Sequence, residues 1–270
     1  KSELDHADLM HLQLKPKSEE TEEEEAAISG FASGCCFDFS RLSEHLFLIG
    51  TEEGRIHKCS KAYNSQYLET YDGHYMAVYT VRWNPFNPKI FISCSADWTV
   101  KLWEHTHTTP IISLDLNNQV GDVAWSPWSS TTFAACTADG KVHVYDLHEN
   151  RNEPMCEQKI VRKAKLTKLA FNLEGDTCPV LLVGDDHSCV SSLKLSPNLR
   201  WTAVTKAEAE RKAKEEAEAA AAGAGPRRGM MPKKVVNEAE KRDPRELELE
   251  KLEAIVDMHI KNLVGASHSE

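Results

Sequence analysis

The sequence predicts an all-β fold, a β-propeller of which about four blades are visible, followed by a helical C-terminal extension. Short strand-like runs rich in β-branched and aromatic residues fill residues 31–200. Within them, acidic turn residues recur at Glu53, Asp97, Asp139 and Asp186, in steps of 44, 42 and 47 residues. This period is typical of a four-stranded propeller blade. Because closed propellers of this kind usually have more blades, we expect the C-terminal part of a larger propeller.

The repeated segments share one order of strands. In the two central copies the predicted strands are 77–85, 90–95 and 99–104, then 122–127, 132–137 and 141–146. An earlier copy covers 36–39, 46–50 and 55–59, and a looser later one covers 168–172 and 180–184. Fourth strands are expected near 66–71, 110–116 and 155–161. A single sheet of this kind cannot bury both of its faces, so the sheets must stack on their neighbours.

The turns between the second and third strands follow a simple rule. Glycine after the acid, as at Gly54 and Gly140, supplies the positive φ of a tight hairpin. Trp98 follows Asp97 instead, which predicts a different turn type there. In the fourth copy either Asp186 or His187 fills the position of the acid.

Four further segments are predicted outside the blades. Residues 1–14 suit the last strand of a preceding blade, and residues 15–30 form an acidic flexible loop. Residues 201–236 combine a charged helix with a flexible linker, and residues 237–265 form a C-terminal amphipathic helix.

The C-terminal helix has clear start signals in Asp243, Pro244 and Glu246. One of its faces carries the apolar residues Leu249, Leu252, Val256, Ile260 and Leu263. Two interpretations remain open: the helix packs on its own propeller, or this face is a partner-binding face that lies in a groove of another chain.

Composition excludes several classes of partner and ligand. A net charge of −10 without a basic stripe speaks against nucleic acid. The chain has neither a run of roughly 18 apolar residues nor a signal peptide, so we expect an intracellular protein with no membrane partner. The eight cysteines include no Cys-x-x-Cys pair, so we expect no metal site.

The usual catalytic signatures are missing: the sequence lacks a phosphate loop, a His-Glu-x-x-His helix and a Gly-x-Ser-x-Gly elbow. We therefore expect no catalytic residue and no cofactor. His74, Asp97 and Ser93 or Ser95 do have the residue types of a hydrolytic triad.

A structural interpretation explains these residues better. A hydrogen-bond network of His74, Ser93, Asp97 and Trp103 would lock the hairpins of one blade. The next copy retains Asp139 and Tyr145 but has no histidine at the matching place, as expected of a degenerate structural repeat.

Particular motifs carry a family resemblance. The residues that resemble WD-repeat proteins are Gly73, His74, Ala96, Asp97, Leu102, Trp103 and Glu104. More narrowly, the runs DGHYMAVYTVRWNPF (72–86), SADWTVKLW (95–103) and VGDVAWSP (120–127) resemble dynein intermediate chains. The turn at 51–54 and the cysteine-containing strands most resemble the axonemal outer-arm type. The resemblance covers roughly residues 1–200.

The resemblance implies a non-catalytic scaffold subunit of a dynein motor complex in the axoneme of a cilium or flagellum. It further implies binding to the tail of a dynein heavy chain beside a second intermediate chain, and assembly of the outer arm on doublet microtubules. Light chains and microtubule docking factors are further implied partners. A cytoplasmic dynein intermediate chain, a generic WD-repeat adaptor and an enzyme with a pocket in the central channel remain alternatives.

Overall fold

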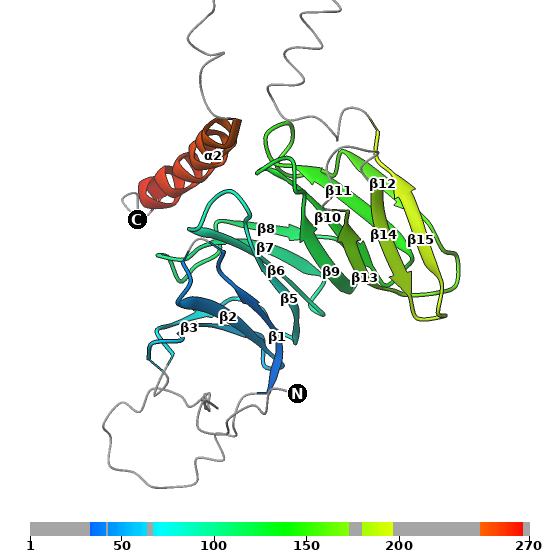
Figure 1. Cartoon of the computed structure of the whole chain (residues 1–270), viewed down its shortest axis with the longest axis horizontal. Coiled ribbons are helices and arrows are strands. Elements are labelled where there is room, and N and C mark those ends of the chain that lie inside the picture. Colours follow the sequence, from blue (N-terminus) through cyan, green and yellow to red (C-terminus); the bar gives the residue numbers. More distant parts are fainter. Residues whose placement is uncertain (1–32, 42, 64–66, 173–179, 197–243, 267–270) are drawn as a thin grey trace, which may run out of the picture.

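The computed structural model describes residues 33–41, 43–63, 67–172, 180–196 and 244–266. These residues contain four antiparallel sheets and one helix, α2 (Pro244–Ala266). Figure 1 shows the sheets one after another in chain order, from the first sheet in blue to the fourth in yellow-green. The predicted segments 1–14, 15–30 and 201–236 and the start of 237–265 lie outside the described residues.

The strands of each sheet lie in chain order and pair antiparallel with the next. The first sheet has β1 (Gly34–Phe39), β2 (Leu46–Thr51), β3 (Arg55–Ser60) and β4 (Glu69–Asp72), and the second has β5 (Val78–Trp83), β6 (Ile90–Ser95), β7 (Thr99–Glu104) and β8 (Ile112–Asp115). The third has β9 (Val120–Trp125), β10 (Thr132–Thr137), β11 (Lys141–Asp146) and β12 (Cys156–Lys159). The described part of the fourth has β13 (Leu166–Phe171), β14 (Val180–Asp185) and β15 (Val190–Lys194).

The prediction of WD-like propeller blades with a helical extension is confirmed. β6, β7, β10 and β11 have the predicted bounds, and β8 and β12 lie within the segments predicted for outer strands. The first strands β1, β5, β9 and β13 are neighbours in space, one sheet to the next. They therefore form the inner edge of the partial propeller, as the first strand of a blade does.

A β-bulge recurs at the start of the first strand in all four sheets. The pairing register shifts between Gly34 and Cys36, between Val78 and Thr80, and between Leu166 and Lys168. In the third sheet the shift skips Gly121, which faces no partner residue. A bulge redirects the side chain that follows it. The residues that follow the four bulges, Cys36, Thr80, Asp122 and Lys168, therefore occupy equivalent positions at the inner edge.

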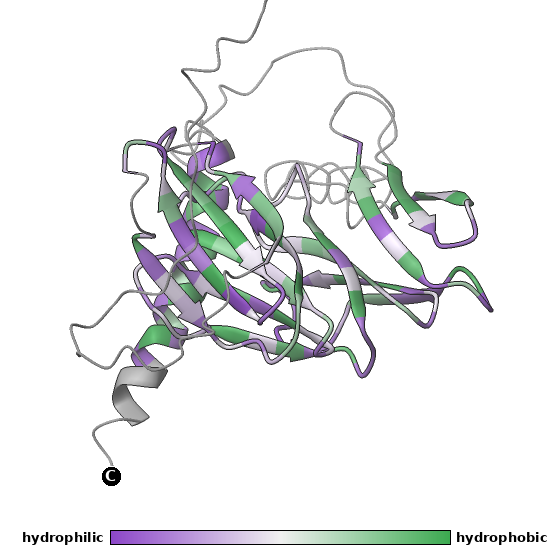
Figure 2. Cartoon of the chain, turned by 90° about the horizontal axis from the view of Figure 1, so that it is seen from below, coloured by the Kyte–Doolittle hydropathy of each residue, from purple (hydrophilic) through white to green (hydrophobic). Residues whose placement is uncertain are grey.

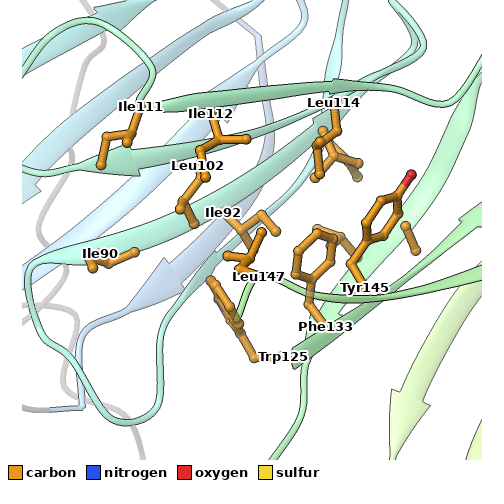
Figure 3. Packing of buried hydrophobic residues seen from close by; sticks show 14 of the residues in the cluster. Ile90, Ile92, Leu102, Ile111, Ile112, Leu114, Trp125, Phe133, Tyr145 and Leu147 are labelled. Atoms are coloured by element: carbon orange, nitrogen blue, oxygen red, sulfur yellow. The ribbon is translucent and has the colours of Figure 1, made fainter. Parts of the chain in front are cut away.

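Three apolar clusters lie between the sheets. One cluster packs the first sheet on the second, another the second on the third, and the last the third on the fourth. Figure 3 shows the middle cluster, where Ile92 of the second sheet lies beside Phe133 of the third and Leu147, which follows β11. Hydrophobic residues gather on the strands and hydrophilic ones on many of the connecting loops (Figure 2). This pattern is the stacking that a two-faced sheet requires.

The turn at Trp98 differs from its prediction. Trp98 has a φ of 72°, in the same left-handed region as Gly54 at 92° and Gly140 at 83°. The prediction of a different turn type is therefore wrong: the tryptophan adopts the conformation that glycine adopts in the neighbouring sheets. A left-handed residue with a side chain costs about 1 kcal/mol or more.

The fourth sheet settles the position of its turn residue. Gly184 pairs with Val190, as Cys94 pairs with Val100 and Cys136 with Val142. This register places Ser188, with a φ of 65°, at the left-handed position. His187, and not Asp186, therefore occupies the position of the turn acid.

Helix α2 begins at Pro244, where the start signals predict it. In the parts of the chain that the structure describes, no helix is both long enough and apolar enough to span a lipid bilayer.

We predict that Gly140→Ala lowers the free energy of unfolding by about 2 kcal/mol or more. Its Cβ would overlap the backbone carbonyl oxygen of Val161, and its φ is positive. Urea unfolding of the full-length protein measures the change in free energy, and hydrogen exchange of the blade amides shows where the protein is destabilised. Gly184→Ala is the control, because its Cβ would meet Lys168 O at an ordinary 3.9 Å. Equal effects of the two substitutions would contradict the argument.

Candidate functional site

The second sheet holds a continuous hydrogen-bond network of four side chains. His74 comes from the loop before β5, Ser93 from β6, Asp97 from the turn after it and Trp103 from β7. His74 Nδ1 lies 2.9 Å from Asp97 Oδ2, and His74 Nε2 lies 2.7 Å from Ser93 Oγ. Trp103 Nε1 donates to the same Ser93 Oγ at 2.8 Å. The network thus joins one loop, one turn and two strands.

The donor and the acceptor of each hydrogen bond in this network can be assigned. An ionised Asp97 can only accept, so His74 Nδ1 donates to it. Ser93 Oγ accepts from the indole and donates its own proton to His74 Nε2. Burial lowers the pKa of His74 although Asp97 opposes this effect, which agrees with a neutral imidazole. Each polar atom therefore has a partner.

Asp97 is held as a carboxylate by several donors. Thr99, which the sequence analysis did not single out, donates both its hydroxyl at 2.7 Å and its backbone N–H at 3.1 Å to Asp97 Oδ1. The backbone N–H of Tyr75 donates to Oδ2 at 3.2 Å. Burial alone would raise the pKa of Asp97, but the hydrogen bonds from His74 and Thr99 outweigh it and hold the pKa well below its usual range.

This geometry does not suit a hydrolytic triad. Ser93 is fully buried, and its oxygen already accepts the indole proton of Trp103. The other candidate, Ser95, is also fully buried and donates to Met76 O. A cavity of about 280 Å³ between the third and fourth sheets and one of about 170 Å³ beside α2 include none of these side chains. The polar atoms of the four side chains are thus occupied by one another within the second sheet.

The third sheet does not join its two predicted residues. Asp139 accepts from Thr137 Oγ1 at 2.5 Å and pairs with Lys141 at 3.5 Å. Tyr145 instead stacks on Phe133, with ring centroids 5.1 Å apart. The polar network of the second sheet is thus not repeated in the third.

The inner edge contains a polar residue that the sequence analysis missed. Asp122, buried on β9, accepts from Thr80 Oγ1 of the second sheet at 2.6 Å. It also accepts from Leu169 N of the fourth sheet at 3.1 Å, and Lys168 Nζ lies 3.6 Å away. One carboxylate therefore bridges three sheets. Its only signal in the sequence is an acid inside an apolar strand.

The apolar face of α2 packs on its own propeller. Leu252 and Val256 are buried in the cluster between the second and third sheets, and Ile260 packs against it. Ile255, which the predicted face omitted, is buried there too, whereas Leu249 is half-buried. The side chain of Leu263 lies outside the described residues. Of the two interpretations, the structure has the helix packed in cis, so this face is not free for a partner's groove.

A buried carboxylate sets the position of the helix. Glu248 Oε2 accepts from Ser130 N at 3.0 Å, and the Ser130 hydroxyl donates to Glu248 O at 2.6 Å. Lys251 Nζ donates to Glu248 Oε1 at 2.7 Å. Lys89 and Arg151, from loops of the second and third sheets, contact the helix at Glu253 and His259. The helix is thus fixed across the seam between two blades.

Comparison with known proteins agrees with this architecture. The family model of the WD domain, G-beta repeat, matches residues 65–104 and 106–146. Each match covers the outer strand of one sheet and three strands of the next, so each repeat links two neighbouring sheets.

Three relatives are similar over about 200 residues. The chain is 54% identical over 203 residues to dynein intermediate chain 2, ciliary, of Heliocidaris crassispina, which is 74% of this chain and 28% of the relative. It is 50% identical over 207 residues to the 78 kDa intermediate chain of the flagellar outer arm dynein of Chlamydomonas reinhardtii, 75% of this chain and 30% of the relative. It is 53% identical over 202 residues to dynein axonemal intermediate chain 1 of Bos taurus, 74% and 28% respectively. The chain thus spans less than a third of the length of these relatives.

Stacked sheets whose strands match WD repeats define a WD-repeat β-propeller protein. Since about half of its residues over this region are identical to those of the relatives, this part of the chain is homologous to the axonemal dynein intermediate chains.

We predict that Ser93→Ala lowers the free energy of unfolding by about 2 to 4 kcal/mol, because it leaves two buried groups, Trp103 Nε1 and His74 Nε2, without a partner. The measurement is urea unfolding of the full-length protein. Ser192→Ala in β15 of the fourth sheet is the control: Ser192 is exposed, so we expect a loss below about 0.5 kcal/mol. A loss no larger for Ser93 than for Ser192 would rule out the network as a stabilising element.

We also predict that Leu252→Ala weakens the docking of α2 by about 2 to 4 kcal/mol, because Leu252 is fully buried. Hydrogen exchange of α2 amides should then accelerate by roughly thirtyfold or more. Lys261→Ala, at an exposed residue of the same helix, should leave the exchange nearly unchanged. Unchanged exchange in Leu252→Ala would show that the helix does not depend on this contact.

Proposed function

We propose that this chain is the WD-propeller part of a non-catalytic scaffold subunit of an axonemal dynein, which binds the tail of a dynein heavy chain beside a second intermediate chain. The observation that carries this proposal is the 50–54% identity to proteins named as ciliary, flagellar outer arm and axonemal intermediate chains. The same names support a place in the axoneme and a part in assembling the outer arm on doublet microtubules.

The fold supports a scaffold role. The sheets are fixed to one another by apolar clusters and by Asp122, so their exposed loops keep fixed relative positions. The polar residues that could have suggested catalysis are saturated by hydrogen bonds inside one sheet. Rigid loops on a stable core are what a protein-binding surface needs.

The test uses the tagged full-length protein in ciliated cells. We expect purification from salt-extracted axonemes to recover a dynein heavy chain and a second intermediate chain in near-equal amounts, with light chains and microtubule docking factors as further members. Removal of the protein should eliminate outer arms from axoneme cross-sections, and the full-length chain should restore them. Recovery of a cytoplasmic dynein heavy chain, or of a complex without any dynein, would contradict the proposal and favour a cytoplasmic intermediate chain or a generic adaptor.

A further inference from the structure

An exposed apolar patch lies at one end of the second sheet. It consists of Tyr75, Met76 and Trp98, which are 89%, 53% and 53% exposed, and we call it the Trp98 patch. Tyr75 and Met76 belong to the loop before β5, and Trp98 to the turn between β6 and β7. The loop and the turn are held together, since Tyr75 N donates to Asp97 Oδ2 and Ser95 Oγ donates to Met76 O. The patch is therefore preorganised.

Trp98 brings little benefit to the fold itself. It adopts a left-handed conformation, with a φ of 72°, at the position where the first and third sheets have Gly54 and Gly140. Its large ring is half in solvent, so packing does not offset the backbone strain. Strain combined with an exposed aromatic group points to a role in binding.

Exposed carboxylates lie on two segments that adjoin the loop and the turn of the Trp98 patch. Glu52 and Glu53 are exposed in the turn whose Gly54 lies directly against the carbonyl groups of His74 and Met76. Asp115 is exposed beside the turn of Trp98, since the next residue, Leu116, donates its N–H to Trp98 O at 3.0 Å.

The positively charged residues nearest to the loop do not cancel this negative charge. Asp72, with a side chain that is 73% exposed, comes just before the loop and lies 3.9 Å from Arg55. Lys101 is buried and donates to Ser113. The described residues around the patch thus combine exposed aromatic rings with an excess of exposed negative charge.

We propose that the Trp98 patch is the docking site for a lysine- or arginine-bearing segment of a partner protein. A guanidinium or ammonium group would lie on the faces of Trp98 and Tyr75, where ring and carboxylates both attract it. An apolar neighbour in the same segment would pack on Met76. The same carboxylates repel nucleic acid and anionic membranes. This inference goes beyond the proposed function, because it specifies the chemistry of the partner whichever complex the chain joins.

The test places a photoreactive group in the patch of the full-length protein. The substitution Tyr75→p-benzoylphenylalanine is introduced in cells that make the protein, and the crosslinked peptide is identified by mass spectrometry. A crosslink to a segment of another protein with net positive charge supports the inference. No crosslink, a crosslink within the same chain, or one to a neutral or acidic segment, to nucleic acid or to lipid overturns it.

This outcome is separate from that of the proposed function. A basic segment from a protein outside dynein would support the docking site and contradict the dynein role. Recovery of a dynein heavy chain without any crosslink from position 75 would do the reverse.

A substitution that keeps the fold separates binding from stability. Trp98→Gly suits the left-handed backbone, so we expect a melting temperature no lower than that of the unsubstituted chain. The crosslink yield at position 75 should nevertheless fall about tenfold. Tyr63→Ala, at another aromatic residue that is 50% exposed, is the matched control and should change neither value. An undiminished yield in Trp98→Gly would overturn the inference.

Discussion

The structure depends on the fact that each small sheet is apolar on two faces and can bury them only against its neighbours. β6 and β10, the second strands of the two central sheets, are buried along their whole length. Each apolar cluster takes its residues from two successive sheets rather than from one. Stability therefore resides in the contacts between blades, and the polar networks act on sheets that apolar packing already holds in place.

The sequence could predict the strands because their signal is local. Alternation, turn residues and the period of 42 to 47 residues are visible in the sequence of the repeats, and the bounds of β6, β7, β10 and β11 follow from them. Contacts between repeats leave no such signal. Asp122 meets Thr80 at a separation of 42 residues, and Glu248 meets Ser130 at 118. The four-residue network was predictable because all of its members lie within one blade. The position of α2 was not, because it depends on contacts with residues far away in the sequence.

The second and third sheets share an aromatic pair and differ in the polar contacts around it. In the second sheet, Trp103, Ser93 and His74 satisfy one another's polar atoms in the interior. In the third, which has no histidine at the matching place, Tyr145 stacks on Phe133 and needs no such network. Phe91 and Trp103 also stack in the second sheet. The shared feature is thus an aromatic pair across the second and third strands, and the hydrogen bonds are an addition that fixes the turn at Asp97.

The two ends of the blades differ in what covers them. The loops that contain Lys89, Ser130 and Arg151 lie at one end, and α2 covers the seam between them. At the opposite end lie the turns of Gly54, Trp98 and Gly140, where the described helix makes no contact. Burial of Leu252 and Glu248 holds the helix on its own propeller. The helix therefore covers part of the surface at that end of the blades. The exposed aromatic groups of the second sheet therefore lie on the end where a partner can approach without first displacing a part of this chain that the structure describes.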